Sequence, residues 1–254
     1  MQRFFVSNGS LQGQQVVFTG QQAHQIRNVL RMGPGDYIVV LDNTGCEYTA
    51  ILSKVERRQV VGELIYKQRT QGEPRTQITL YQALLAREKF EWVLQKCTEV
   101  GAARFVPMVT ERSIVRRPDT VTARRLSRWR RIITEAAEQS GRGRIPQLEA
   151  PVNFPDAVSG LDGFDRCLIG SPQAAGPSLR EFLRAGDTEP VVVALLIGPE
   201  GGFTDKEVQE ACANGAIPIS LGRRILRTET AAVVACALIL YELGELMPKA
   251  SCEQ

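Results

Sequence analysis

The sequence predicts an α/β protein in which a small β-rich domain precedes a larger domain built on a parallel sheet. Three observations predict this: short β-like runs up to about residue 65, a polar stretch over residues 66–77, and strands that alternate with helices from residue 78 onward. Alternation of strands and helices is typical of a parallel sheet, whereas strands joined by short turns form sandwiches or barrels. With 254 residues, the chain is long enough for two units that each bury a core.

The N-terminal region carries five β-like runs, at residues 3–6, 15–18, 37–41, 47–52 and 60–65. Turn-forming residues separate them at 33–36 and 42–45, so we expect a small β-barrel. Between the second and third runs, apolar residues recur at helical spacing, which predicts a short helix with Arg27 and Arg31 at its edge. The polar stretch that follows contains Gly72 and Pro74 and is expected to be a linker.

The second region begins with a strand at 78–84, a helix at 89–100 that ends at Gly101, and a strand at 104–109, in the order of a βαβ unit. A long helix is predicted at 121–140. Further on, we expect a strand, a short helix, a strand, a helix, a strand and a terminal helix, at residues 167–169, 179–183, 191–197, from 204, 217–221 and 229–246. The strongly apolar strand at 191–197 should be central and buried on both faces. Thr204 and Glu207 have the spacing of a capping box at a helix start.

Composition and charge narrow the function classes. Hydrophobic residues make up 43% and charged residues 23% of the chain, which is typical of a soluble globular protein. The longest apolar run, residues 231–240, is too short to span a bilayer, and residues 1–9 show no export signal, so we expect a cytoplasmic protein without a membrane partner. Six scattered cysteines and a single histidine, His24, argue against a disulfide framework, a metal site and a serine-histidine-acid triad. We expect His24 to be a partly buried barrel residue.

Arginine is clustered although the net charge is only +3. The clustered arginines are Arg112, Arg116, Arg117, Arg124, Arg125, Arg128, Arg130, Arg131, Arg142 and Arg144. Positive charge gathered in this way can form a phosphate-binding surface. A solvated helix face with ordinary ion pairs is an equally good interpretation of the clustering alone.

Two loops after predicted strands have unusual sequences. Residues 198–203, GPEGGF, contain three glycines, whose permissive torsions let a backbone approach a ligand closely. Residues 222–230, GRRILRTET, combine a glycine with apolar residues and three arginines. Because ligands of open α/β sheets bind beyond the carboxyl ends of the strands, both loops are candidate ligand sites. No phosphate-loop or dinucleotide fingerprint is present, so a nucleotide held by its base, sugar and backbone contacts fits best.

These two loops carry a family resemblance. Residues 196–207 (LIGPEGGFTDKE) and 221–232 (LGRRILRTETAA) resemble the paired signature of the knotted SPOUT methyltransferases. They are more closely similar to the ribosomal small subunit methyltransferase E family, which methylates N3 of a uridine in 16S ribosomal RNA. Further matches to that family occur along nearly the whole chain, at residues 3–6, 23–36, 96–101, 111–113 and 138–142.

The resemblance implies a PUA-like, RNA-binding β-barrel at residues 1–71 and a SPOUT catalytic domain with a C-terminal deep trefoil knot at residues 72–254. It also implies S-adenosylmethionine as cofactor and a homodimer that meets through the knot region. In this superfamily a third loop usually completes the cofactor pocket, and in this chain it corresponds to Gly170-Ser171-Pro172. The other implied cofactor-binding residues are Leu196, Ile197, Gly198, Pro199, Glu200, Gly201, Leu221, Gly222, Ile225 and Leu226.

The implied chemistry is methyl transfer from a sulfonium, which needs no metal. Arg227 and Arg3 would stabilise negative charge on the uracil. Glu229 would orient an arginine or accept the proton; alternatively, Arg227 and Glu229 form only a structural ion pair near a helix N-terminus. The predicted phosphate contacts are Arg27, Arg31, Arg112, Arg142 and Arg144, each with a solvated surface charge as its alternative.

The implied partner is 16S ribosomal RNA, either free or within an assembled small subunit. Two other functions stay open at this point. One is a methyltransferase that acts on another RNA, such as transfer RNA or a ribose hydroxyl. The other is a non-catalytic, RNA-binding assembly factor that has kept the fold.

Overall fold

The structure is a computed structural model, and it describes residues 1–172, 179–184 and 191–246. The chain forms two compact units. The first unit comprises Met1–Glu73 together with Ala137–Ile145, and the second comprises Pro74–Ala136 together with Pro146–Gln254. The chain therefore leaves the first unit, returns to it for nine residues, and leaves it again.

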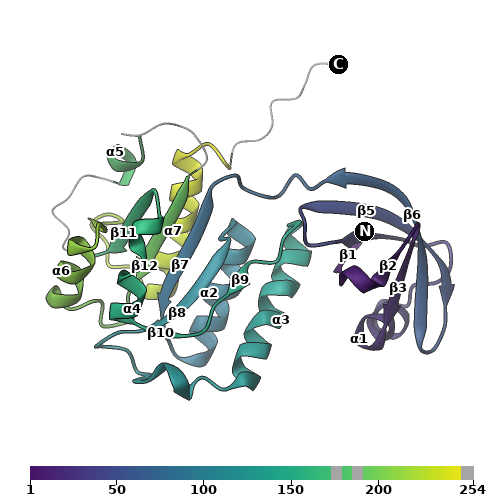
Figure 1. Cartoon of the computed structure of the whole chain (residues 1–254), viewed down its shortest axis with the longest axis horizontal. Coiled ribbons are helices and arrows are strands. Elements are labelled where there is room, and N and C mark those ends of the chain that lie inside the picture. Colours follow the sequence, from purple (N-terminus) through teal and green to yellow (C-terminus); the bar gives the residue numbers. More distant parts are fainter. Residues whose placement is uncertain (173–178, 185–190, 247–254) are drawn as a thin grey trace. The chain divides into compact units, whose positions relative to one another are not determined.

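A six-stranded mixed sheet forms the first unit (Figure 1). Its strands are β1 (Gln2–Phe5), β2 (Leu11–Gln12), β3 (Gln15–Thr19), β4 (Tyr37–Leu41), β5 (Cys46–Val55) and β6 (Gln59–Arg69). Their order is β1-β4-β5-β6-β3-β2; β1 pairs with β4 in parallel, and the other neighbours are antiparallel. All five predicted strands are confirmed.

The linker begins later than predicted, because strand β6 ends at Arg69 and not at residue 65. Strand β6 continues through residues 67–69, because Lys67 pairs with Tyr48 and Arg69 pairs with Cys46 on β5. These polar residues are exposed, so their sequence lacks the apolar alternation that marks the rest of the strand. Backbone pairing with a neighbouring strand decides the structure here.

The predicted short helix is confirmed, as α1 (Gly20–His24) continued by one π-helical turn, Gln25–Val29. Ala23 and Ile26 point into the core of the sheet, where Phe4 and Phe18 stack edge to face with centroids 5.7 Å apart. His24 is exposed, so the prediction of a partly buried histidine was wrong. The buried positions of this helix are taken by its apolar residues, and His24 faces away from them.

The nine-residue return of the chain completes a second small core in the first unit. Phe5 and Leu41 pack with Ala137, and the Phe5 N–H donates to Glu138 Oε1 at 2.8 Å. Burial of these apolar side chains stabilises the unit by roughly 25 cal/mol per Å² of surface removed from water. No sequence pattern indicated that the end of a helix from the second region would belong to the first unit.

A parallel sheet forms the second unit. Its strands are β7 (Gln77–Ala83), β8 (Arg104–Val109), β9 (Gln147–Leu148), β10 (Val152–Asn153), β11 (Arg166–Gly170), β12 (Val192–Ile197) and β13 (Ile217–Ile219). The order is β10-β8-β7-β12-β11-β13, with β9 paired to β8, and every pairing is parallel. Strand β12 lies in the middle and is buried from Val193 to Ile197, as predicted.

The helices of this unit are α2 (Arg87–Val100), α3 (Ala123–Ser140), α4 (Phe154–Val158), α5 (Leu179–Arg184), α6 (Asp205–Ala213) and α7 (Thr228–Glu242). The capping box at the start of α6 is confirmed. The Glu207 N–H donates to the Thr204 hydroxyl, and the Thr204 N–H donates to the Glu207 carboxylate. Gly101 ends α2 with φ +128°, and a Cβ there would lie 2.8 Å from Pro74 Cγ. Helix α7 ends four residues earlier than predicted, before Gly244 at φ +75°.

Two general properties of the described chain bear on function. No helix within the described ranges is long and apolar enough to cross a membrane. The five cysteines outside the undescribed C-terminal end are free thiols.

Candidate functional site

Three loops meet at the carboxyl edge of the parallel sheet. Because β11, β12 and β13 run in the same direction, the segments that follow them leave at one edge. The Ser171 N–H donates to the Ile219 carbonyl at 2.9 Å, which joins the ends of β11 and β13. A Cβ on Gly170 would lie 3.2 Å from Ile197 Cδ1, so the small residue lets β11 approach β12 at this point. The sheet thus presents the Gly170, Gly198 and Gly222 loops side by side.

A buried hydrogen-bond chain ties the two signature loops together. The Thr228 hydroxyl donates to the Gly198 carbonyl, and Gln82 Nε2 donates to Thr228 Oγ1 at 3.3 Å. Thr228 is 7% exposed and Gln82 is 1% exposed, so this chain is shielded from water. The loop after β12 and the start of α7 therefore occupy one place, which is the arrangement that a shared nucleotide site requires.

Two buried oxygen atoms at this place have no hydrogen-bond partner among the described residues: Gln82 Oε1 and Glu229 Oε2. An unsatisfied buried polar atom costs about 1–3 kcal/mol, and native proteins leave few of them. Both atoms are acceptors, so they call for a donor from beyond the described residues, such as a bound ligand. Gln82 and Thr228 were missed at the sequence level, because a polar residue near a strand end carries no pattern of its own.

Side chains from other elements brace the glycine-rich loop. Arg112 Nη1 donates to the Gly201 carbonyl at 2.8 Å, and Lys89 Nζ lies 2.8 Å from Glu200 Oε1. Partial burial raises the pKa of the Glu200 carboxyl, but the hydrogen bond from Lys89 helps to hold it below its usual value. Glu200 and Arg112, predicted to contact cofactor and RNA, are therefore each engaged in supporting the loop.

The predicted apolar pocket residues differ in exposure. Leu196 is completely buried and its side chain belongs to the core of the sheet, so only its backbone can face a ligand. Gly222 has φ +106°, a conformation that L side chains rarely adopt. Ile225 is 89% exposed. Its side chain is therefore accessible to a ligand or to a second chain.

Arg227 and Glu229 lie at the start of α7. Arg227 is exposed and immediately precedes the helix, and its carbonyl accepts the Ala231 N–H at 2.8 Å. Its side chain makes no ion pair or hydrogen bond within the described ranges, Glu229 included. The alternative interpretation, a structural ion pair between these two residues, is therefore wrong. The Arg227 guanidinium is available to a substrate.

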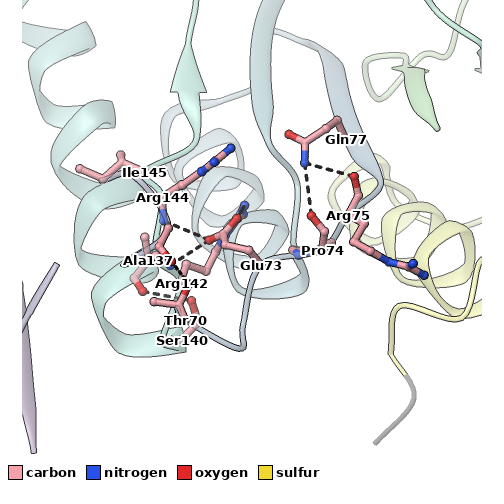
Figure 2. A network of polar contacts seen from close by, with 12 residues as sticks. Thr70, Glu73, Pro74, Arg75, Gln77, Ala137, Ser140, Arg142, Arg144 and Ile145 are labelled. Carbon is pink, nitrogen blue, oxygen red and sulfur yellow. Dashed lines mark hydrogen bonds and ion pairs between the residues drawn. The ribbon is translucent and has the colours of Figure 1, made fainter. Parts of the chain in front are cut away.

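Five of the predicted functional arginines belong to the first unit, and they differ in accessibility. They are Arg3, Arg27, Arg31, Arg142 and Arg144. Arg142 is 3% exposed and bonds to Glu73 through Nε at 3.1 Å and Nη2 at 3.0 Å (Figure 2). Arg144 is exposed and donates to the Thr44 carbonyl. Arg3 has a buried Nε without a partner among the described residues. The Arg142 guanidinium therefore lies inside the unit, away from any phosphate.

Arg31 has an unusual backbone conformation. It follows the π-helical turn with φ +55°, in the left-handed region where glycine is the common residue. A non-glycine residue there costs of order 1–3 kcal/mol, and such strain clusters at functional sites. Arg31 and its neighbour Arg27 are both exposed. Both side chains are thus free to contact a partner.

Two family models match the chain. One is an RNA methyltransferase domain, which matches residues 72–240. The other is an RNA methyltransferase PUA domain, which matches residues 18–65.

Curated relatives and solved structures resemble the chain over most of its length. Ribosomal RNA small subunit methyltransferase E of Synechocystis sp. is 37% identical, over 88% of this chain and 72% of the relative. The Bacillus subtilis protein of that name is 32% identical, over 95% of this chain and 97% of the relative. The Neisseria gonorrhoeae protein of that name, solved with bound S-adenosyl methionine, has a TM-score of 0.86 at 31% identity, covering 97% of this chain and all of that one.

A second solved structure also contains the cofactor. The putative methyltransferase of Legionella pneumophila, in complex with S-adenosyl methionine, has a TM-score of 0.84 at 33% identity. The match covers 94% of this chain and 96% of that one. The likeness therefore spans both units, not the parallel sheet alone.

Proposed function

Because the chain belongs to the ribosomal RNA small subunit methyltransferase E family, we propose that it methylates N3 of a uridine in 16S ribosomal RNA, with S-adenosylmethionine as the methyl donor. The observation that carries this proposal is the buried chain from Gln82 through Thr228 to Gly198, which brings the two signature loops to one place. The substrate is the RNA, free or within the small subunit, and its modification would take place in the cytoplasm.

The residues at the sheet edge fit this cofactor. The orphaned oxygens of Gln82 and Glu229 are acceptors, and S-adenosylmethionine carries amine and hydroxyl donors. The glycine-rich loop offers mainly backbone N–H and C=O groups, which can hydrogen-bond an adenosyl ligand. When bound, S-adenosylmethionine supplies a methyl group on positively charged sulfur, which a nucleophile can displace directly. The residues that would hold it are Leu196, Ile197, Gly198, Pro199, Glu200, Gly201, Leu221, Gly222, Ile225 and Leu226, in several cases through backbone atoms.

The catalytic task of the chain is to make uracil N3 nucleophilic. N3 carries a proton that must be lost or shared before the nitrogen can attack. Arg227 has an exposed guanidinium without a partner among the described residues, and a nearby positive charge favours the uracil anion. Glu229, two residues further on, would orient that guanidinium or accept the proton. Arg3 is the second candidate for stabilising the negative charge on the base.

We assign RNA binding chiefly to residues 1–71, as a PUA-like barrel, and catalysis to residues 72–254. Exposed Arg27 and Arg31 support the first assignment, and Arg144 has an exposed guanidinium as well. Arg112 can reach RNA only with the nitrogens that the glycine-rich loop leaves free. The burial of Arg142 against Glu73 favours an organising role for this arginine over a phosphate contact.

A trefoil knot is supported by the course of the C-terminal segment. Strand β13 lies at the edge of the sheet, beyond β11. The chain then returns toward the centre, since Thr228 at the start of α7 bonds to the loop after β12 and α7 packs against α2, β12 and β7. A return of this kind past a neighbouring loop is what a knotted topology requires.

A homodimer is supported by the surface of α7. This helix is apolar on every side, and such helices are normally buried. Leu238 is 38% exposed and Tyr241 is 48% exposed, in line with half-buried Ala231 and Val234 on the same side of the helix. A second copy of the chain would cover this stripe and bring two knot regions together.

Leu238→Glu is expected to make the protein monomeric, because a charge in an apolar interface is strongly unfavourable. Light scattering after size-exclusion chromatography would measure the mass. Ile65→Glu, which changes an exposed apolar residue of β6 instead, should leave the mass unchanged. A wild-type monomer, or a dimer with Leu238→Glu, would contradict the assignment of this interface.

The function itself is tested by complementation. Small subunits from cells that lack the gene would be incubated with the protein and labelled S-adenosylmethionine, and the RNA would be digested to locate the methylated nucleoside. We expect 3-methyluridine in 16S RNA. Label in another RNA would identify a different RNA methyltransferase, and calorimetry that shows no cofactor binding would identify an assembly factor.

A further inference from the structure

Positive charge is concentrated in one segment of the second unit. Residues 112–131 contain eight arginines and one acidic residue, Asp119, for a formal charge of +7, while the whole chain carries +3. The other residues together are therefore net negative. The segment consists of the first half of helix α3 and the chain that leads to it.

Helix energetics do not explain these arginines. The first turn of α3 contains no acidic residue and begins Ala123-Arg124-Arg125, although the amino end of a helix disfavours positive charge. Arg124 and Arg128 are four residues apart, and like charges at this spacing destabilise a helix by about 0.2–0.5 kcal/mol. A merely solvated face would alternate its charges, so this placement indicates a partner.

Some of the arginines are used inside the protein and others are not. Arg125 lies over the ring of buried Trp129, with Cζ 4.7 Å from the centroid, and Arg128 makes a two-pronged contact with Glu91 on α2. Arg124 and Arg130 are exposed and have no acidic partner in the described part of the chain. Their charges remain available.

We propose that the exposed arginines of α3 bind phosphates of the RNA backbone away from the methylated base; this inference rests on the proposed function. We call this surface the arginine track, and it comprises Arg124 and Arg130, the two exposed arginines of this helix segment without an acidic partner among the described residues. From Arg124 to Arg130 it extends about 9 Å along the helix, enough for more than one phosphate of a strand.

The course of the chain connects the arginine track to the catalytic edge. The arginine-rich segment starts at Arg112, just beyond the carboxyl end of β8, where its side chain holds Gly201 of the glycine-rich loop. From there the chain leads into α3, which packs beside α2 through Phe90 and Trp129 at 4.5 Å between centroids (Figure 1). RNA that enters the site from this side would meet these arginines. An exposed cationic surface attracts phosphates without reading sequence.

The test compares Arg124→Gln/Arg130→Gln with a matched control, Arg75→Gln/Arg104→Gln. The control removes the same charge at the amino ends of β7 and β8, the opposite edge of the sheet. Binding of protein-free 16S RNA is measured against salt concentration, together with KM, kcat and the cofactor Kd. For the track variant we expect affinity at low salt to fall on the order of tenfold and the salt slope to shrink by about 1.5. Cofactor Kd and kcat should stay at the wild-type values.

Three outcomes would overturn the proposal. The track variant could bind RNA like the control, or it could lose affinity only for assembled subunits, which would indicate a protein partner. Arg124→Lys/Arg130→Lys could also fail to restore binding although it keeps the charge. If the wild type transfers no methyl group, the proposed function fails instead, and the RNA-binding comparison still decides whether the track binds phosphate.

Discussion

Arg227→Ala is expected to lower kcat by about 100- to 1000-fold, the typical loss when one stabiliser of a developing anion is removed. The cofactor Kd should stay within about tenfold of wild type, or 1.4 kcal/mol, because the proposed role of this side chain is to contact the base rather than the cofactor. The physical reason is that the Arg227 guanidinium is exposed and unpaired, so nothing else in the described chain competes for it. Single-turnover kinetics and calorimetry measure the two quantities separately.

The pH dependence of this variant distinguishes catalysis from structure. A guanidinium lowers the pKa of uracil N3, so its removal matters most at a pH where the free base is protonated. As pH rises and the base loses its proton unaided, the ratio of wild-type to variant rate should shrink. Arg104→Ala, which removes an arginine from the opposite edge of the sheet, should match wild type throughout. A ratio that is constant with pH would remove Arg227 from this role.

Glu73→Ala is expected to destabilise the first unit by about 3–5 kcal/mol, because it removes the carboxylate that pairs with the buried charge of Arg142. The Glu73 carboxylate also accepts the Gly143 and Arg144 N–H groups at 2.9 and 3.1 Å, so three residues lose a partner at once (Figure 2). Urea denaturation followed by circular dichroism measures the loss.

The control for this prediction is Glu135→Ala. Glu135 pairs with Arg131 at 2.9 Å, but both side chains are more than half exposed, and such pairs contribute less than about 1 kcal/mol. Burial, rather than the presence of an ion pair, thus sets the expected difference. Equal losses in the two variants would show that Arg142 finds water or another partner when Glu73 is absent.

Much of the fold followed from local sequence patterns. The apolar run of β12 predicted a central buried strand, and Thr204 with Glu207 predicted the start of α6. Strands β9 and β10 have two residues each, too few to show a period, and were missed. The end of β6 was missed because its polar residues are held by pairing with β5 alone.

The candidate site was predicted where a motif carried it and missed where distant residues meet. The glycine-rich loop and the Arg227 loop were identified from their sequences, and the structure brings them together. Arg142 was expected to be available to RNA, because its partner Glu73 lies 69 positions earlier in the chain. Gln82 reaches Thr228 across 146 positions, and no local pattern reports such a contact.

The return of Ala137–Ile145 to the first unit affects how the protein is made. An N-terminal domain usually finishes folding while the rest of the chain is still being translated. Here Phe5 and Glu73 have no complete set of partners until Ala137, Glu138 and Arg142 are made, some seventy codons after Glu73. At typical synthesis rates of 5–20 residues per second, that delay is roughly 4–14 s. During this interval the growing chain exposes an unfinished apolar surface and an unpaired carboxylate, and a fragment cut after residue 71 would expose that surface permanently.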